Sequence, residues 1–110
     1  MAIAIDLDGT LAEYHGWKGE EHIGKAIKPM MERVKKWIAE GEEVVIFTAR
    51  GGDPVEKHYV DLWLKQHGLD LEVTNIKRKS FKVFYDDRAK QVIPNSGIVV
   101  ESDHGYMGGL

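Results

Sequence analysis

The stretch Ile5-Asp6-Leu7-Asp8-Gly9-Thr10-Leu11 decides the fold, because it places two carboxylates one residue apart directly after the apolar run Ala2-Ile3-Ala4-Ile5. A short apolar run that ends before a glycine predicts a buried strand followed by a tight loop. We therefore expect both aspartates at the carboxyl end of this strand. In open α/β sheets, ligands bind at that edge.

Strand and helix patterns alternate along the rest of the chain, as is typical of a parallel sheet with crossover helices. We expect helices over residues 29–40 and from residue 53 or 54 to residue 68. Strands are expected at residues 2–5, 43–48, 71–74, 82–85 and 98–100, all in one sheet. A chain of 110 residues suffices for one core and not for two. The sequence predicts a single α/β domain over residues 1–110, with a frayed tail from about residue 102.

The amino-acid composition indicates a globular protein and excludes several classes of site. The chain is 43% hydrophobic and 30% charged, which is typical of globular proteins. It has no cysteine, which excludes disulfides, thiolate catalysis and cysteine-bound zinc. A net charge of −3 argues against a nucleic-acid footprint over the whole surface, despite a basic cluster within residues 77–82. We see no signal peptide and no stretch of membrane-spanning length, so we expect a cytoplasmic protein with no membrane partner.

Three of the expected strands end in reactive side chains. Asp6 and Asp8 follow the first strand, Thr48 ends the second, and Asp86-Asp87 follow the strand at 82–85. In a parallel sheet these ends are neighbours, and each close pair of carboxylates costs roughly 4 kcal/mol at an effective dielectric constant of about 20. Folding then requires a cation, a raised pKa, or both. Oxygen ligands alone favour a hard ion, Mg²⁺ ahead of Ca²⁺.

Four segments, in order, resemble the motifs of the haloacid dehalogenase superfamily of phosphohydrolases. They are Asp6-Leu7-Asp8-Gly9-Thr10, Phe47-Thr48-Ala49-Arg50, the basic segment Lys77 to Lys82, and Tyr85-Asp86-Asp87-Arg88. The match spans Ile3 to about Ala89. The resemblance implies a Rossmann-like domain of three layers around a central parallel sheet. Neither interval in which the family inserts a cap domain is long enough to hold one here, so we expect a small capless member.

The resemblance also implies roles for residues. Asp6 is similar to the nucleophile that forms an aspartyl-phosphate, and Asp8 to the general acid and base. Mg²⁺ would be held by Asp6, by the backbone carbonyl of Asp8, and by the Asp86-Asp87 pair. Thr48 would donate a hydrogen bond to the phosphoryl group. The loop amides at Gly9 and Thr10, together with Ala49, would complete the phosphate cradle.

Two assignments within the motifs stay open. The lysine that balances the phosphate charge is Lys77, which follows the Thr74-Asn75 pair, or Lys79. Because the last motif is Asp-Asp, it is open which carboxylate contacts the ion directly, and we favour Asp87, with Asp86 binding directly or through water.

Substrate recognition falls to short segments. Arg50, just beyond Thr48, is expected to contact a second anionic group. Trp17 lies in the glycine-rich stretch from Glu13 to Lys25, and we expect it on a small flap where its ring stacks on a base. The substrate class is a nucleotide, a sugar phosphate or a polynucleotide end. A capless site is open, and an oligomer is one way to supply a lid.

The sequence predicts a Mg²⁺-dependent phosphatase, with two alternatives. One is a phospho-accepting signalling module, because receiver domains also combine acidic residues, a threonine and a lysine on a parallel sheet. Their motif order differs, since their acceptor aspartate follows a later strand. The other is a phosphate-binding domain without catalysis, which the four chemically intact motifs disfavour.

Overall fold

The structure is a computed structural model that describes residues 1–101. The tail predicted from about residue 102 lies outside the described residues.

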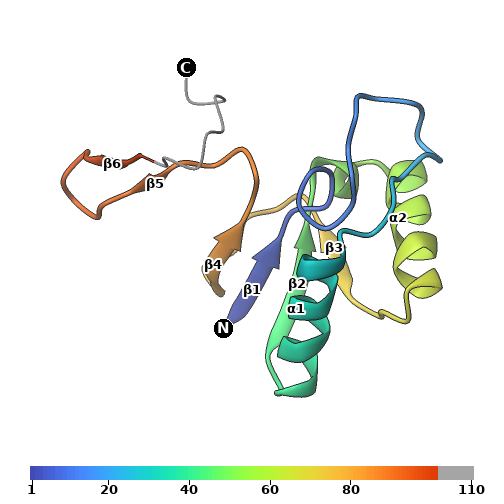
Figure 1. The fold of residues 1–110 in the computed structure, drawn as a ribbon, viewed down its shortest axis with the longest axis horizontal. Coiled ribbons are helices and arrows are strands. Elements are labelled where there is room, and N and C mark those ends of the chain that lie inside the picture. Colours follow the sequence, from blue (N-terminus) through green and yellow to red (C-terminus); the bar gives the residue numbers. More distant parts are fainter. Residues whose placement is uncertain (102–110) are drawn as a thin grey trace.

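The central element is a four-stranded parallel sheet in the order β3-β2-β1-β4 (Figure 1). Its strands are β1 (Ala2–Ile5), β2 (Glu43–Phe47), β3 (Glu72–Thr74) and β4 (Phe81–Tyr85). Ile5 lies opposite Ile46 on one side and Tyr85 on the other, so these three strands reach the same edge together. The expected fold class, an α/β domain with a central parallel sheet and no cap domain, is confirmed.

Two helices connect the first three strands. They are α1 (Lys28–Ala39) and α2 (Pro54–Gln66), and each begins with a proline in its first turn, where the missing N–H costs nothing. Asp53 caps α2, because its Oδ1 accepts from the amides of Val55 at 2.9 Å and Glu56 at 3.1 Å. The helices end near the glycines that the sequence pointed to, Gly41 and Gly68.

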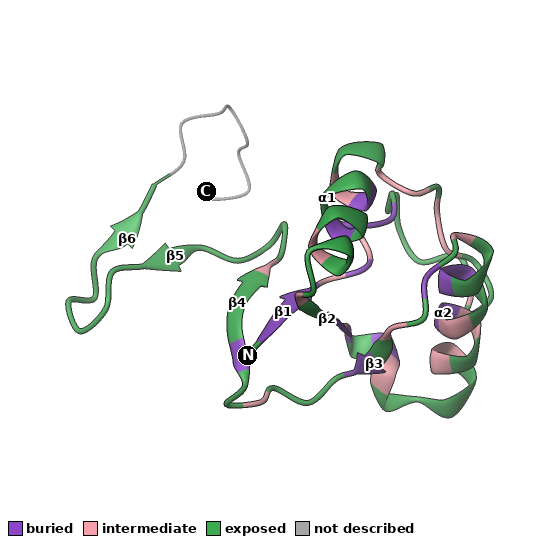
Figure 2. Cartoon of the chain, turned by 90° about the horizontal axis from the view of Figure 1, so that it is seen from below, coloured by how far each residue is buried: buried purple, intermediate pink, exposed green. Residues whose placement is uncertain are grey.

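Both helices pack against the same face of the sheet (Figure 2). Ile3 and Ile5 of β1 point into this helix-covered core, with Val34 of α1 and Val60 and Leu64 of α2. The steps from β1 to β2 and from β2 to β3 run in one direction across the sheet, and right-handed crossovers then put both helices on one side.

The opposite face of the sheet carries a smaller apolar cluster, Ala2, Ala4, Val45 and Phe81, with Phe47 packed against it. The connection from β3 to β4 contains no helix, and no helix of the described part of the chain covers this face. Residues 1–101 therefore supply two of the three layers that the resemblance implies.

The last two strands form a separate hairpin rather than joining the sheet. β5 (Gln91–Val92) pairs antiparallel with β6 (Val99–Val100), and the hairpin extends away from the sheet (Figure 1). The expectation that residues 98–100 close the central sheet is therefore wrong. Asn95 and Gly97 have positive φ angles of 61° and 72°, and a tight local turn of this kind pairs a strand with the one just before it.

Among residues 1–101, neither helix has the length and apolar character that crossing a bilayer requires.

Candidate active site

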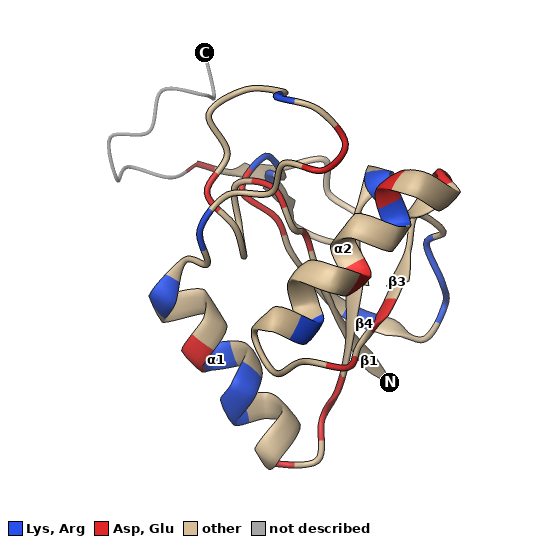
Figure 3. Cartoon of the chain, turned by 90° about the vertical axis from the view of Figure 1, so that its right-hand side faces the viewer, with Lys and Arg blue, Asp and Glu red and all other residues tan. Residues whose placement is uncertain are grey.

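Three carboxylates meet at the carboxyl edge of the sheet. Asp6 leaves β1, while Asp86 and Asp87 leave the neighbouring strand β4, and the Asp6 amide donates to the Tyr85 carbonyl at 2.9 Å. One carboxylate oxygen from each of the three aspartates lies within 4.8 Å of the others. Figure 3 shows acidic segments gathered where the chain leaves these strands. Of the four carboxylates that the sequence placed at this edge, three from distant parts of the chain converge in the fold, and Asp8 is not among them.

Thr10 holds two of these carboxylates in place. Its Oγ1 lies 3.0 Å from Oδ1 of Asp87 and 3.4 Å from Oδ2 of Asp6, and it accepts from the Asp87 amide at 3.0 Å. The residue is buried, and the amides of Gly9 and Thr10 donate to the carbonyls of Ala12 and Leu7. Thr10 thus organises the carboxylates, and the polar groups of the predicted cradle at Gly9 and Thr10 are engaged within the protein.

Gly9 is required by both conformation and space. Its φ is +90°, a region that other residues rarely adopt. A Cβ at this position would lie 2.5 Å from Oδ2 of Asp87. Any side chain here would displace the carboxylates.

The environment of Asp6 raises its pKa from 3.8 to about 7. Burial is the largest cause, followed by the negative charge of Asp86 and the hydrogen bond and charge of Asp87, while the Leu7 amide acts in the opposite direction. A divalent cation among these oxygens would offset the repulsion. Mg²⁺ fits the donor set, because it prefers hard oxygen ligands and takes one or two carboxylates with water and phosphate.

Asp8 stands apart from the three clustered acids. Its two oxygens accept from Arg50, with 2.8 Å between Nε and Oδ2 and 3.1 Å between Nη2 and Oδ1. Its side chain is not one of the three that could share an ion. The prediction that the Asp8 backbone carbonyl binds the metal stays a prediction.

Arg50 is almost fully buried, with 4% of its surface exposed. Besides Asp8, it donates to the carbonyls of Glu20 at 3.1 Å and His22 at 3.0 Å. A guanidinium has five N–H groups, and these contacts use four of them. Four of the five donors with which we expected Arg50 to bind a second anionic group of the substrate are therefore committed to the protein itself, and one Nη1 N–H remains.

Thr48 ends β2 beside this network. It is buried, and its Oγ1 accepts from the Arg50 amide at 3.3 Å. The hydroxyl can still donate its own hydrogen. Thr48 therefore suits the predicted contact with a phosphoryl oxygen.

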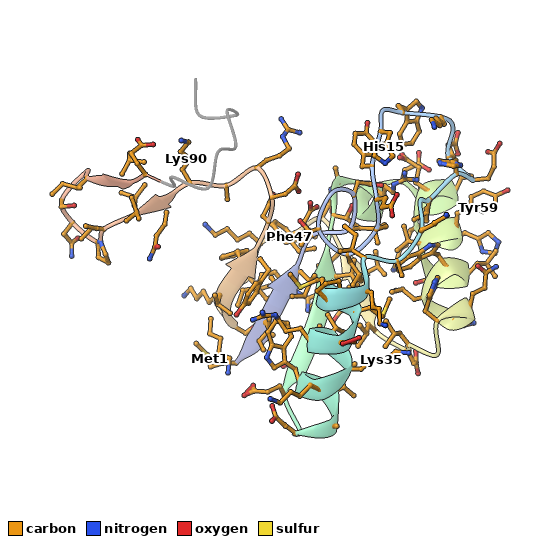
Figure 4. The ribbon with its side chains drawn as sticks, in the orientation of Figure 1. Met1, His15, Lys35, Phe47, Tyr59 and Lys90 are labelled. Carbon is orange, nitrogen blue, oxygen red and sulfur yellow. The ribbon has the colours of Figure 1, made fainter. Side chains whose placement is uncertain are left out.

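One cavity of about 770 Å³ brings most of the predicted residues together. Eight of them line it: Asp6, Asp8, Trp17, Thr48, Ala49, Arg50, Asp86 and Asp87. Gly9 and Thr10 line an adjoining hollow that also reaches Asp86 and Asp87. The segment 13–25, which we call the flap loop, lies beyond the strand ends, where Figure 4 labels His15.

The structure does not bring a predicted lysine into this cavity. Lys77 Nζ lies 5.3 Å from the centre of the Phe84 ring, and neither Lys77 nor Lys79 lines the cavity. Phe84 packs with Phe47 and Phe81 of the helix-free face, so the Lys77 side chain lies along that face of the sheet. Lys82 pairs with Glu42 at 2.8 Å.

Among the other residues that line the cavity, Glu56, Asn75 and Arg88 carry charged or amide groups to which the sequence prediction gave no role. Arg88 directly follows the Asp86-Asp87 pair, so its place at the strand end was a readable signal. Asn75 follows Thr74 at the end of β3, and the same argument from strand ends applies to it. Glu56, in the first turn of α2, had no such signal.

Comparison with known proteins adds information on the fold. The sequence matches no protein-family model and no curated protein. A solved structure of a conserved protein from Bacteroides thetaiotaomicron is similar, with a TM-score of 0.63 and 25% identity, over 81% of this chain and 77% of that chain. Its description names no activity, so the likeness bears on the architecture alone.

Proposed function

We propose that this protein is a Mg²⁺-dependent phosphohydrolase of the haloacid dehalogenase superfamily that works through an aspartyl-phosphate on Asp6. The observation that carries the proposal is the meeting of the Asp6, Asp86 and Asp87 carboxylates within 4.8 Å. They do so in a cavity that Asp8 and Thr48 also line. This is the residue set that the first, second and fourth motifs assign to nucleophile, metal site, acid and base, and phosphate contact, whereas neither candidate lysine of the third motif lines the cavity.

The three clustered carboxylates would hold the Mg²⁺. When bound, the ion offsets the repulsion between Asp6 and an anionic phosphate and stabilises the charge that develops on the phosphoryl oxygens. Asp6 must be ionised to attack, and without a cation its pKa is about 7. The nucleophile therefore depends on this charge balance.

Two steps complete the reaction. An Asp6 oxygen attacks phosphorus while the bond from phosphorus to the leaving oxygen breaks, and Asp8 gives that oxygen a proton. Water then attacks the phosphorus of the aspartyl-phosphate and passes a proton to Asp8. The bond to Asp6 breaks and inorganic phosphate leaves. Thr48 donates a hydrogen bond to a phosphoryl oxygen in both steps.

The surroundings of the site suit a phosphate ester with a planar group. Trp17 and Tyr14 are 54% and 45% exposed and both line the cavity, so an aromatic group can stack there. Arg88 is an exposed cation in the same cavity. A nucleotide or a polynucleotide end uses all of these groups, and a sugar phosphate uses Arg88 alone.

The test is steady release of phosphate from an aryl phosphate with Mg²⁺, followed by the same assay on nucleotides, sugar phosphates and 5′- or 3′-phosphorylated oligonucleotides. Asp6→Asn should lower turnover at least about a thousandfold without unfolding the protein, because it removes the nucleophile and keeps the shape. Asp70→Asn, an exposed aspartate outside the cavity, is the matched control. Wild-type turnover in Asp6→Asn would refute the nucleophile.

Labelling with phosphate from the substrate separates the alternatives. Asp8→Asn should slow the breakdown of the phosphoenzyme, so that label accumulates on Asp6. A single stoichiometric labelling without turnover in the wild type would instead favour a phospho-accepting module. Phosphate binding with neither labelling nor release would favour a binding domain.

A further inference from the structure

Arg50 is buried, and buried arginines are rare unless they are paired. Its Nε and Nη2 donate to the two oxygens of Asp8 at 2.8 and 3.1 Å. This bidentate geometry fixes the orientation of the carboxylate as well as binding it. The Arg50 side chain is 5% exposed and the Asp8 side chain 22% exposed, so the pair is partly shielded from water.

The same guanidinium holds the flap loop. Nη1 donates to the Glu20 carbonyl at 3.1 Å and Nη2 to the His22 carbonyl at 3.0 Å. The Trp17 ring lies over the guanidinium, with Cζ 4.8 Å from the ring centre, a favourable cation–π arrangement. Three positions spread along the flap loop therefore converge on one side chain.

The base of the flap loop has separate anchors. The Glu13 amide donates to the Lys25 carbonyl at 2.8 Å, and Trp63 Nε1 donates to the Gly24 carbonyl at 3.0 Å. These contacts close the loop at residues 13 and 24–25. Arg50 is thus the shared anchor for the part between them.

Arg50 is itself held rigidly against the sheet. It lies in the short 3₁₀ turn Ala49–Gly52, in which the Arg50 amide donates to the capping Oγ1 of Thr48 at 3.3 Å. A Cβ on Gly51 would lie 2.6 Å from the Thr74 carbonyl carbon, so this turn is pressed against the end of β3. A turn packed this closely leaves the Arg50 backbone little room to shift, so the flap loop and Asp8 are linked through one fixed side chain.

We propose that Arg50 is a positioning residue that latches the flap loop to Asp8, so that Asp8 faces the cavity correctly only while the loop is in place. The positioning of Asp8 rests on the proposed function, since it matters only if Asp8 transfers protons. The latch itself does not depend on the proposed function, because it is a set of contacts that links the flap loop to the Asp8 carboxylate. Through this link, a substrate that contacts Trp17 would also steady Asp8.

The latch predicts a coupling in both directions. Loss of Arg50 should free the middle of the flap loop, and loss of the Asp8 carboxylate should free it as well, because Arg50 then loses the partner that fixes its orientation. Lysine should restore only part of the effect, since one ammonium cannot match the fork and reach two carbonyls.

Trypsin gives a readout that needs no catalysis, because Lys18 lies exposed in the middle of the flap loop. The variants are Arg50→Gln, Arg50→Lys and Asp8→Ala, all in the full chain. Arg78→Gln is the control, because Arg78 pairs with Glu72 on the surface of the protein and does not line the cavity. We expect cleavage after Lys18 to rise at least about fivefold in Arg50→Gln and Asp8→Ala, to rise less in Arg50→Lys, and to stay unchanged in Arg78→Gln.

The second readout is hydrolysis of the aryl phosphate with Mg²⁺. Arg50→Gln should lower kcat by about 10- to 100-fold and leave KM within about threefold, because misplacing a catalytic group affects the chemical step more than binding. Arg50→Lys should recover part of the kcat that Arg50→Gln loses. If Arg50→Gln instead caused a general structural defect, trypsin cleavage would rise at every site and KM would change as well. If Arg50→Gln does not fold, Arg50→Lys alone decides: wild-type cleavage and kcat in that variant would overturn the latch.

Three further results would overturn the inference or part of it. Unchanged cleavage after Lys18 in both Arg50→Gln and Asp8→Ala would remove the latch. Faster cleavage with an unchanged kcat would remove the positioning of Asp8. A wild type that releases no phosphate would refute the proposed function and with it any role for Asp8, while the trypsin comparison would still decide the latch.

Discussion

The raised pKa of Asp6 makes the stability of the metal-free protein fall as the pH rises, and Asp6→Asn should abolish that loss. The folded protein keeps a proton on Asp6 up to about pH 7, whereas the unfolded chain releases it near 3.8. Between these values the folded state binds more protons, so the free energy of unfolding decreases with increasing pH. Asparagine cannot titrate, and it keeps the shape of the side chain.

The size of the effect follows from the same pKa. While Asp6 is protonated in the folded state and ionised in the unfolded state, the free energy of unfolding falls by about 1.4 kcal/mol per pH unit. Between pH 5 and pH 7 the expected fall is therefore about 3 kcal/mol. Because the carboxylates border an open cavity and water screens their charges, we expect about half of that, about 1.5 kcal/mol. This is a large fraction of the stability of a small domain.

Urea unfolding followed by tryptophan fluorescence measures the effect, in EDTA at pH 5, 6, 7 and 8. The difference in unfolding free energy between Asp6→Asn and the wild type should grow by about 1.5 kcal/mol across the series. Asp70→Asn should show a constant difference from the wild type, and Mg²⁺ at pH 8 should stabilise the wild type more than Asp6→Asn. Parallel curves for Asp6→Asn and the wild type would refute the reasoning, and so would a wild type that gains relative stability at high pH.

Three further predictions concern the metal site and the core. Gly9→Ala should cost about 1–3 kcal/mol and weaken Mg²⁺ binding in calorimetry, whereas Gly41→Ala, also at positive φ but in open space, should cost stability and leave Mg²⁺ binding intact. Asp87→Asn should weaken Mg²⁺ binding at least about tenfold, because a carboxylate ligand is lost; equal affinity would exclude Asp87 as a ligand. Ile46→Ala, in the fully buried core, should lower the free energy of unfolding in urea by about 2–5 kcal/mol. Val99→Lys, on the exposed hairpin, should change it by less than about 0.5 kcal/mol. Similar losses for the two variants would mean that the hairpin packs against the rest of the domain.

The residues that meet at the sheet edge were predictable because their positions follow from local pattern. A short apolar run predicts a strand, and the residue after its last apolar side chain leaves the sheet at the edge. Parallel strands with aligned ends then bring Asp6, Thr48 and Asp86 together whatever the details of packing. The same argument, carried one residue further, would have found Asn75 and Arg88.

The roles of side chains within that edge depended on contacts between distant residues. Arg50 and Asp8 are 42 positions apart, and nothing in the sequence around either residue indicates that the Arg50 guanidinium binds the Asp8 carboxylate. Lys77 lies on a connection without regular structure, so the sequence does not say which face of the sheet its side chain reaches. From the sequence, Thr10 is a loop residue with a hydroxyl group, and only the structure shows that this hydroxyl contacts Asp87.

By itself, then, the sequence determined the alternation of strands and helices and the edge at which the acids gather, because both follow from the period of apolar residues along the chain. The tertiary structure alone decided that β5 and β6 form a hairpin away from the sheet, that both helices cover one face, and that Arg50 serves the protein's own carboxylate. An apolar run such as Ile98-Val99-Val100 fits a central strand and a hairpin equally well. The strand that a run pairs with is selected by turn geometry, burial and charge, and these depend on contacts that the apolar pattern of the run does not specify.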